Sequence, residues 1–151
     1  MYRGSTFGDL FDAYAKVSGK PLLIGEYGID AYDASVYEED QLTHAQYTMN
    51  LVEELERHSV ACVANCEGHV ASGGFIMSWV DEYWKEGQIG PECPQFDNAA
   101  QSPCGSVRNM DFPDEFMNEE WWGMLTVARG CTLGDTDILT PRLAYLEVCV
   151  W

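Results

Sequence analysis

The sequence has little positive charge, because 8 Lys and Arg side chains stand against 25 Asp and Glu, which gives a net charge of −17 at pH 7. Binding the phosphates of DNA or RNA needs a basic surface, so the composition argues against a nucleic-acid partner. The same charge argues against docking on anionic lipid. No apolar run is long enough to span a bilayer, so we expect no membrane insertion.

The sequence also lacks metal-ligand spacing. Its six cysteines include no Cys-x-x-Cys pair, and no histidine lies near them in a zinc-ligand pattern. The three histidines have no partner spacing, and the acidic residues between Asp111 and Glu120 do not follow the EF-hand pattern. We therefore expect neither a metal site nor a cofactor.

A secretion signal is missing as well, because residues 1–4, Met-Tyr-Arg-Gly, have neither the basic stretch nor the apolar run of a signal peptide. The chain is then either cytosolic or lacks its true N-terminus. An even number of cysteines permits an oxidising compartment, and we expect a secreted or extracellular protein. Cys93 and Cys104 flank proline and glycine in an otherwise unanchored segment, so we expect them to form a disulfide that closes a short loop.

What the sequence does have is enough apolar character, 46% of its residues, to build one core at this length. Residues 6–17 predict an amphipathic helix, since their apolar side chains recur on one face and Thr6 and Asp9 resemble a capping box. A second helix is expected to start near Glu38, and a last one near Pro141.

Two short apolar runs, 22–25 and 75–80, show no alternation, which is typical of strands buried on both faces of a parallel sheet. Helices and buried strands that alternate along a chain predict a parallel α/β architecture. Two strands alone cannot complete such a sheet. Residues 86–118 hold four of the six prolines and little periodicity, so we expect a long irregular insertion there, followed by a short helix or turn over 119–125.

Glu26 is the strongest candidate for a catalytic residue in the sequence. It ends the first apolar run, and a carboxylate at the carboxyl end of a buried parallel strand lies where α/β barrels keep their catalytic groups. A buried carboxylate without partners would be costly, so the structural alternative is a glutamate that pairs with an arginine.

The motifs around this residue resemble those of clan A glycoside hydrolases. Residues 20–28, Lys-Pro-Leu-Leu-Ile-Gly-Glu-Tyr-Gly, are similar to the seventh-strand motif of these barrels, and residues 73–79, Gly-Gly-Phe-Ile-Met-Ser-Trp, to their eighth strand. Residues 2–4 resemble the end of the sixth strand, and residues 120–123 with 141–145 resemble the way such barrels close on their last helix. The nearest resemblance is to β-glucuronidase- and β-galactosidase-type barrels and to β-1,3-glucanosyltransferases.

The resemblance implies that residues 1–151 are the C-terminal part of a (β/α)₈ TIM barrel, about strands six or seven to eight, with a long loop after strand eight over 86–118. It implies a retaining mechanism with Glu26 as the nucleophile. It also implies substrate-binding roles for further residues: Tyr2, Tyr27, Trp79, Asp81, Glu82 and Trp84. The alternatives are a terminal tyrosine for Tyr2, a core indole for Trp79 and solvated loop residues for those after it.

The sequence departs from the family in one respect, because no Asn-Glu at a strand end precedes Glu26 to supply the acid/base. A complete barrel also takes about 250 residues. We therefore expect a fragment of a retaining glycoside hydrolase or transglycosylase that acts on β-linked oligosaccharides or polysaccharides and is inactive alone. The alternatives are a non-catalytic carbohydrate-binding or pseudoenzyme fragment, and a secreted α/β domain with no role in sugar binding.

Overall fold

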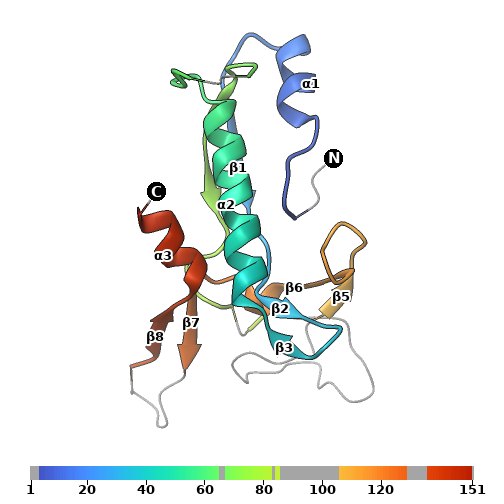
Figure 1. Ribbon diagram of the computed structural model, residues 1–151, viewed down its shortest axis with the longest axis vertical. Coiled ribbons are helices and arrows are strands. Elements are labelled where there is room, and N and C mark those ends of the chain that lie inside the picture. Colours follow the sequence, from blue (N-terminus) through green and yellow to red (C-terminus); the bar gives the residue numbers. More distant parts are fainter. Residues whose placement is uncertain (1–3, 65–66, 83, 86–105, 129–135, 151) are drawn as a thin grey trace.

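The fold is a parallel pair of strands flanked by helices and by three small antiparallel hairpins (Figure 1). The computed structural model describes residues 4–64, 67–82, 84–85, 106–128 and 136–150. Three positions with expected roles, Tyr2, Cys93 and Cys104, lie outside these residues. Within the described part, no helix combines the length and the apolar character that crossing a bilayer requires.

Strand β1 (Leu22–Tyr27) pairs in parallel with strand β4 (Ala71–Ile76), as the alternation of elements predicted. The bounds expected for the second strand, 75–80, are wrong, because β4 overlaps that run only at Phe75 and Ile76. Leu22 lies opposite Ala71, and Ile24 lies opposite Gly74. Helix α2 (Gln41–Arg57) connects the two strands and lies along them in Figure 1. Its apolar face and the strands share one core with side chains from the N-terminal segment: Phe7, Phe11, Tyr27, Leu51, Val52, Leu55, Val70 and Ala71.

The expectation that these strands are buried on both faces is wrong in this structure. Leu23 is 54% exposed and Phe75 is 63% exposed, whereas Leu22 and Ile24 pack on the core. Side chains of a strand alternate between its two faces, and α2 covers only one of them. The β1–β4 pair therefore presents an apolar face that no described element covers.

Helix α1 (Leu10–Val17) is four residues shorter than the predicted helix over 6–17. The capping box expected at its start does not form, because the Thr6 hydroxyl accepts a hydrogen bond from the Gly8 N–H over 3.0 Å and Asp9 makes no side-chain cap bond. The residues before Leu10 instead form a turn.

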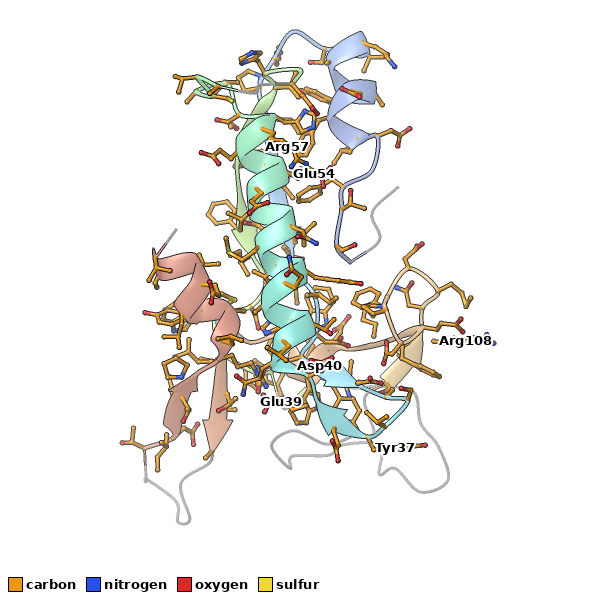
Figure 2. All side chains as sticks on the ribbon, in the orientation of Figure 1. Tyr37, Glu39, Asp40, Glu54, Arg57 and Arg108 are labelled. Carbon is orange, nitrogen blue, oxygen red and sulfur yellow. The ribbon has the colours of Figure 1, made fainter. Side chains whose placement is uncertain are left out.

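Acidic side chains anchor both ends of α2. Figure 2 shows Glu39 and Asp40 at its first turn and Glu54 near its last. Asp40 caps the helix by accepting the Thr43 N–H over 3.0 Å, and Glu54 Oε2 accepts the Phe7 N–H over 3.0 Å. Because Glu54 is buried, this bond ties the segment before α1 to the helix.

Three hairpins occupy segments that carry no periodic signal. Strand β2 (Tyr32–Asp33) pairs with β3 (Glu38–Glu39), β5 (Ser106–Arg108) with β6 (Phe116–Asn118), and β7 (Leu125–Ala128) with β8 (Ile138–Pro141). The β5–β6 hairpin corrects the prediction that all of residues 86–118 are irregular. Strands of two to four residues are too short for alternation to show in the sequence.

The C-terminal elements follow the sequence more closely. A 3₁₀ turn, η2 (Glu119–Trp121), lies where a short helix or turn was predicted. Helix α3 (Leu143–Val150) starts two residues after Pro141 and packs against α2. Ala45, Met124, Leu125 and Ala144 form a second core cluster at this contact.

A wholly buried ion pair holds these parts together. Arg142 and Asp81 are both 0% exposed, and the guanidinium donates to the two carboxylate oxygens over 2.5 and 2.7 Å. Arg142 also donates to the Gly123 carbonyl over 2.6 Å and to Glu39 over 2.7 Å. One side chain thus joins β3, the loop after β4, the turn before β7 and the start of α3.

A second buried carboxylate, Asp30, joins the loop after β1 to β6. It is 6% exposed and accepts the Asn118 N–H. Burial raises the pKa of Asp30 to about 8; the Asn118 hydrogen bond and the Arg142 charge act against this rise, and the Asp114 charge adds to it. Near neutral pH Asp30 is therefore largely protonated.

We expect Asp81→Asn to lower the free energy of unfolding by about 3–5 kcal/mol, because it removes the buried one of the two carboxylates that pair with Arg142 and leaves only the partly exposed Glu39. Urea unfolding measures the loss. The double variant Asp81→Leu/Arg142→Met should lose less free energy of unfolding than the sum of the losses in Asp81→Leu and in Arg142→Met, since it removes both charges. Arg108→Met is the control: it breaks an exposed 3.3 Å pair with Glu115 and should cost only about 0–1 kcal/mol.

We also expect the free energy of unfolding to fall as the pH rises from about 6.5 to about 8. Asp30 binds its proton more tightly in the folded chain than in the unfolded chain. Its contribution to the free energy of unfolding is therefore complete below its unfolded pKa of 3.8 and is lost as the pH rises to its folded pKa of about 8. Burial lowers the pKa of His44 to about 3 in the folded chain. Between pH 3 and its ordinary pKa of 6.5, His44 therefore makes the free energy of unfolding rise with pH, which opposes the effect of Asp30. Asp30→Asn should abolish the fall above pH 6.5, and a variant that kept it would contradict this assignment.

Candidate functional site

Glu26 is the last residue but one of β1, at the carboxyl end of a parallel strand as the sequence predicted. The parallel partner β4 ends at Ile76, so residues that follow the two strands lie at the same edge. The Met77 N–H donates to the Tyr27 carbonyl over 2.8 Å, which extends the pairing beyond β4. Glu26 is exposed, and no arginine in the described part of the chain pairs with it, which argues against the structural alternative.

A pocket of about 430 Å³ lies beside Glu26. Its charged lining residues are Glu26, Lys85 and Glu119. The apolar part of the lining consists of Phe7, Leu10, Ile24, Tyr27, Met77 and Trp122. A mostly apolar concavity with a few converging polar groups is the usual form of a small-molecule site, and this volume is within the usual range.

Lys85 stands between two carboxylates in this part of the molecule. Its Nζ lies 3.2 Å from Glu119 Oε2 and 3.7 Å from Glu82 Oε2. Burial lowers the pKa of Lys85, but the hydrogen bond and charge of Glu119, with those of Glu82, outweigh it and raise the pKa above its ordinary value. The pocket therefore holds a lasting positive charge beside its carboxylates.

Backbone pairing brings Trp122 to the pocket from far along the chain. The Ser78 N–H donates to the Trp122 carbonyl over 2.9 Å, and the Met124 N–H donates to the Ser78 carbonyl over 2.8 Å. Gly123 makes this approach possible, since a Cβ there would collide with the Asp81 backbone nitrogen. The segment before β7 thus continues the sheet beyond β4.

The sequence predicted an aromatic platform at Trp79, and the structure places this indole elsewhere. Trp79 is 61% exposed and packs edge-on against Tyr145, with 5.6 Å between ring centroids. It does not contribute to the described lining of the pocket beside Glu26. The alternative that Trp79 is a core side chain is wrong, because more than half of its surface is open; Trp84 is exposed as well.

The remaining predicted residues have different surroundings. Asp81 is buried, and Arg142 and the Gly123 N–H already bind its carboxylate, so the expectation that it binds a sugar hydroxyl is corrected to a structural role. Glu82 faces Lys85 rather than open solvent. Tyr27 lines the pocket but is 7% exposed, and burial raises the pKa of its hydroxyl to about 12.

Sequence reasoning missed Lys85, Glu119 and Trp122 as members of the site around Glu26. The sequence marks Trp122 only within a segment that resembles a barrel-closing motif, and Glu119 only among the acidic residues between Asp111 and Glu120. The sequence signal that could have identified these residues is the presence of adjacent charged and aromatic residues in two segments, 82–85 and 119–122. Their spacing along the chain does not predict that the two segments contact each other in the fold.

A second pocket, of about 150 Å³, lies beside the β2–β3 hairpin and contains four aspartates: Asp30, Asp33, Asp40 and Asp114. Each carboxylate accepts a backbone N–H, from Asn118, Ser35, Thr43 and Ala34 respectively. Among the described residues, no group of three or more His, Cys, Asp or Glu side chains is arranged to hold a metal ion. Asp33 and Asp40 therefore cap a turn and α2, whereas Asp30 and Asp114 tie together segments that are distant in sequence.

Comparison with known proteins adds no relative to this picture. No protein-family model, no curated protein and no solved structure matches the chain.

Proposed function

We propose that this chain is the C-terminal part of the (β/α)₈ barrel of a retaining glycoside hydrolase or transglycosylase that acts on β-linked glycans, with Glu26 as its nucleophile. One observation carries the proposal: Glu26 is an exposed carboxylate at the carboxyl end of a parallel strand, in a pocket with an apolar wall and two further charges. This edge is where barrels of this kind place their reacting groups.

The open face of the β1–β4 pair supports an incomplete barrel. Parallel strands occur almost only in sheets covered on both faces, and here the face of Leu23 and Phe75 is uncovered by the described elements. In a complete barrel the outer face of each strand packs on helices, as β1 and β4 pack on α2, and the inner face fills the interior. Further strands of the same barrel would bury these side chains.

The chemistry requires two carboxyl groups about 5–5.5 Å apart, flanking the bond that is cleaved. Glu26 attacks the anomeric carbon and forms a covalent glycosyl-enzyme, while an acid protonates the leaving oxygen. Water or an acceptor sugar then releases the glycosyl group. The resemblance assigns the acid/base to an earlier strand of the barrel, so the isolated 151 residues are expected to be inactive.

A non-catalytic carbohydrate-binding fragment is the second candidate. The observation that favours it is the exposure of Trp79 and Trp84, 61% and 53%, in the loop after β4. Exposed indoles suit the apolar faces of sugar rings. Binding of β-linked oligosaccharides by the complete protein without any turnover would favour this role, and absence of both would favour a protein that does not act on sugars.

We expect an activated 2-fluoro β-glycoside to label Glu26 in the complete enzyme, because this inactivator traps the glycosyl-enzyme. Peptide mapping by mass spectrometry locates the label. Glu26→Ala should lose nearly all turnover of an aryl β-glycoside while sugar binding survives. Glu53→Ala, which removes an exposed carboxylate from α2, is the control and should leave turnover unchanged. Labelling of another carboxylate would overturn the assignment.

We expect Trp79→Ala to weaken the binding of a β-linked oligosaccharide by about 1–3 kcal/mol, the scale of losing one aromatic contact. Isothermal titration calorimetry on the complete protein measures the change. Tyr37→Asn is the matched control, because Tyr37 is an exposed aromatic on the β2–β3 turn and asparagine tolerates its positive φ of 61°. If affinity stays unchanged in Trp79→Ala, this indole takes no part in binding.

A further inference from the structure

We propose that Lys85 and Glu119 form the hydroxyl-binding wall of the pocket beside Glu26, where they hold two neighbouring hydroxyls of one sugar ring. The inference rests on the proposed function and names the part of the site that selects the sugar. Both side chains line the same pocket as Glu26, although they come from the loop after β4 and from η2.

The geometry of the pair suits a vicinal diol. Lys85 Nζ lies 3.2 Å from Glu119 Oε2, so an ammonium donor and a carboxylate acceptor stand side by side. An ammonium has three N–H donors, of which Glu119 and Glu82 engage two, and a carboxylate accepts at two oxygens, so both Lys85 and Glu119 keep capacity for a ligand. One hydroxyl can donate to the carboxylate while its neighbour accepts from the ammonium.

The exposure of the pair is intermediate, as a binding role requires. The side chains of Lys85 and Glu119 are 32% and 39% exposed, so a ligand in the pocket can reach both. A pair this exposed contributes little to stability, about 0–1 kcal/mol, which makes a purely structural role a weak account of it. A bound sugar would exclude water and strengthen its hydrogen bonds to these charges.

The rest of the pocket completes the environment of a ring. Trp122 is 9% exposed, and its indole is held by the backbone pairing of its own residue with Ser78. The better exposed apolar lining residues, Leu10 and Met77, give an apolar surface for the C–H face of a pyranose, while the charged pair meets the ring edge. Sites of this composition fix orientation through their few polar groups.

The test measures affinity and kinetics of Lys85→Met and Glu119→Gln in the complete enzyme, with an aryl β-glycoside and with analogues that lack single ring hydroxyls. Each variant should bind the parent sugar about 10–100-fold more weakly, the scale of losing a charge-assisted hydrogen bond. At least one deoxy analogue should bind the parent enzyme as weakly as the variants bind the parent sugar. The affinity for that analogue should not fall further in the variants. Lys85→Arg, which keeps the charge, should recover part of the affinity.

The control is the exposed pair of Arg108 and Glu115, 3.3 Å apart, whose variant Arg108→Met should bind the sugar normally. Thermal unfolding of each variant separates loss of binding from loss of fold. Labelling of Glu26 with unchanged affinity in both pocket variants, or additive losses with every deoxy analogue, would overturn the inference and leave the proposed function standing. Absence of both labelling and sugar binding in the parent enzyme would overturn the two together.

Discussion

The buried guanidinium of Arg142 is the interaction on which the rest of the structure depends. It has no exposed surface, and its donors are taken up by Asp81, Glu39 and the Gly123 carbonyl. A charge removed from water must be met by partners in good geometry, so the segments that carry these groups have little freedom to move apart. These segments are β3, the loop after β4, the turn before β7 and the residue before α3.

The pocket beside Glu26 follows from this anchor. Fixing Asp81 and Gly123 sets residues 78–81 alongside residues 122–125, and the backbone hydrogen bonds between them complete the alignment. Trp122 and Glu119 then line the same pocket as Glu26 at the end of β1, and Lys85 lies between Glu119 and Glu82. A carboxylate on a strand acquires its aromatic and charged neighbours because an ion pair outside the pocket holds the loops that bear them.

The β1–β4 pair has one face that packs against α2 and one open face that no described element covers. On the covered face, Leu22 and Ile24 are partly buried and pack against the core that α2 shares, and Asp40 and Glu54 form hydrogen bonds near the two ends of α2. On the open face, Leu23 and Phe75 remain exposed. The pair of strands that the apolar runs predicted to be covered on both sides is therefore covered by the described elements on one side only.

The sequence by itself determined α2, α3, the strand β1 and the place of Glu26, because each depends on periodicity or order along the chain. It predicted a parallel partner for β1 but set that strand over 75–80, whereas β4 is Ala71–Ile76. It did not determine the hairpins, whose strands of two to four residues show no period. Nor did it show that Asp81 is structural or that Lys85, Glu119 and Trp122 surround Glu26. Only the tertiary structure decided these, because burial of Arg142 and pairing between segments distant in sequence bring the groups together.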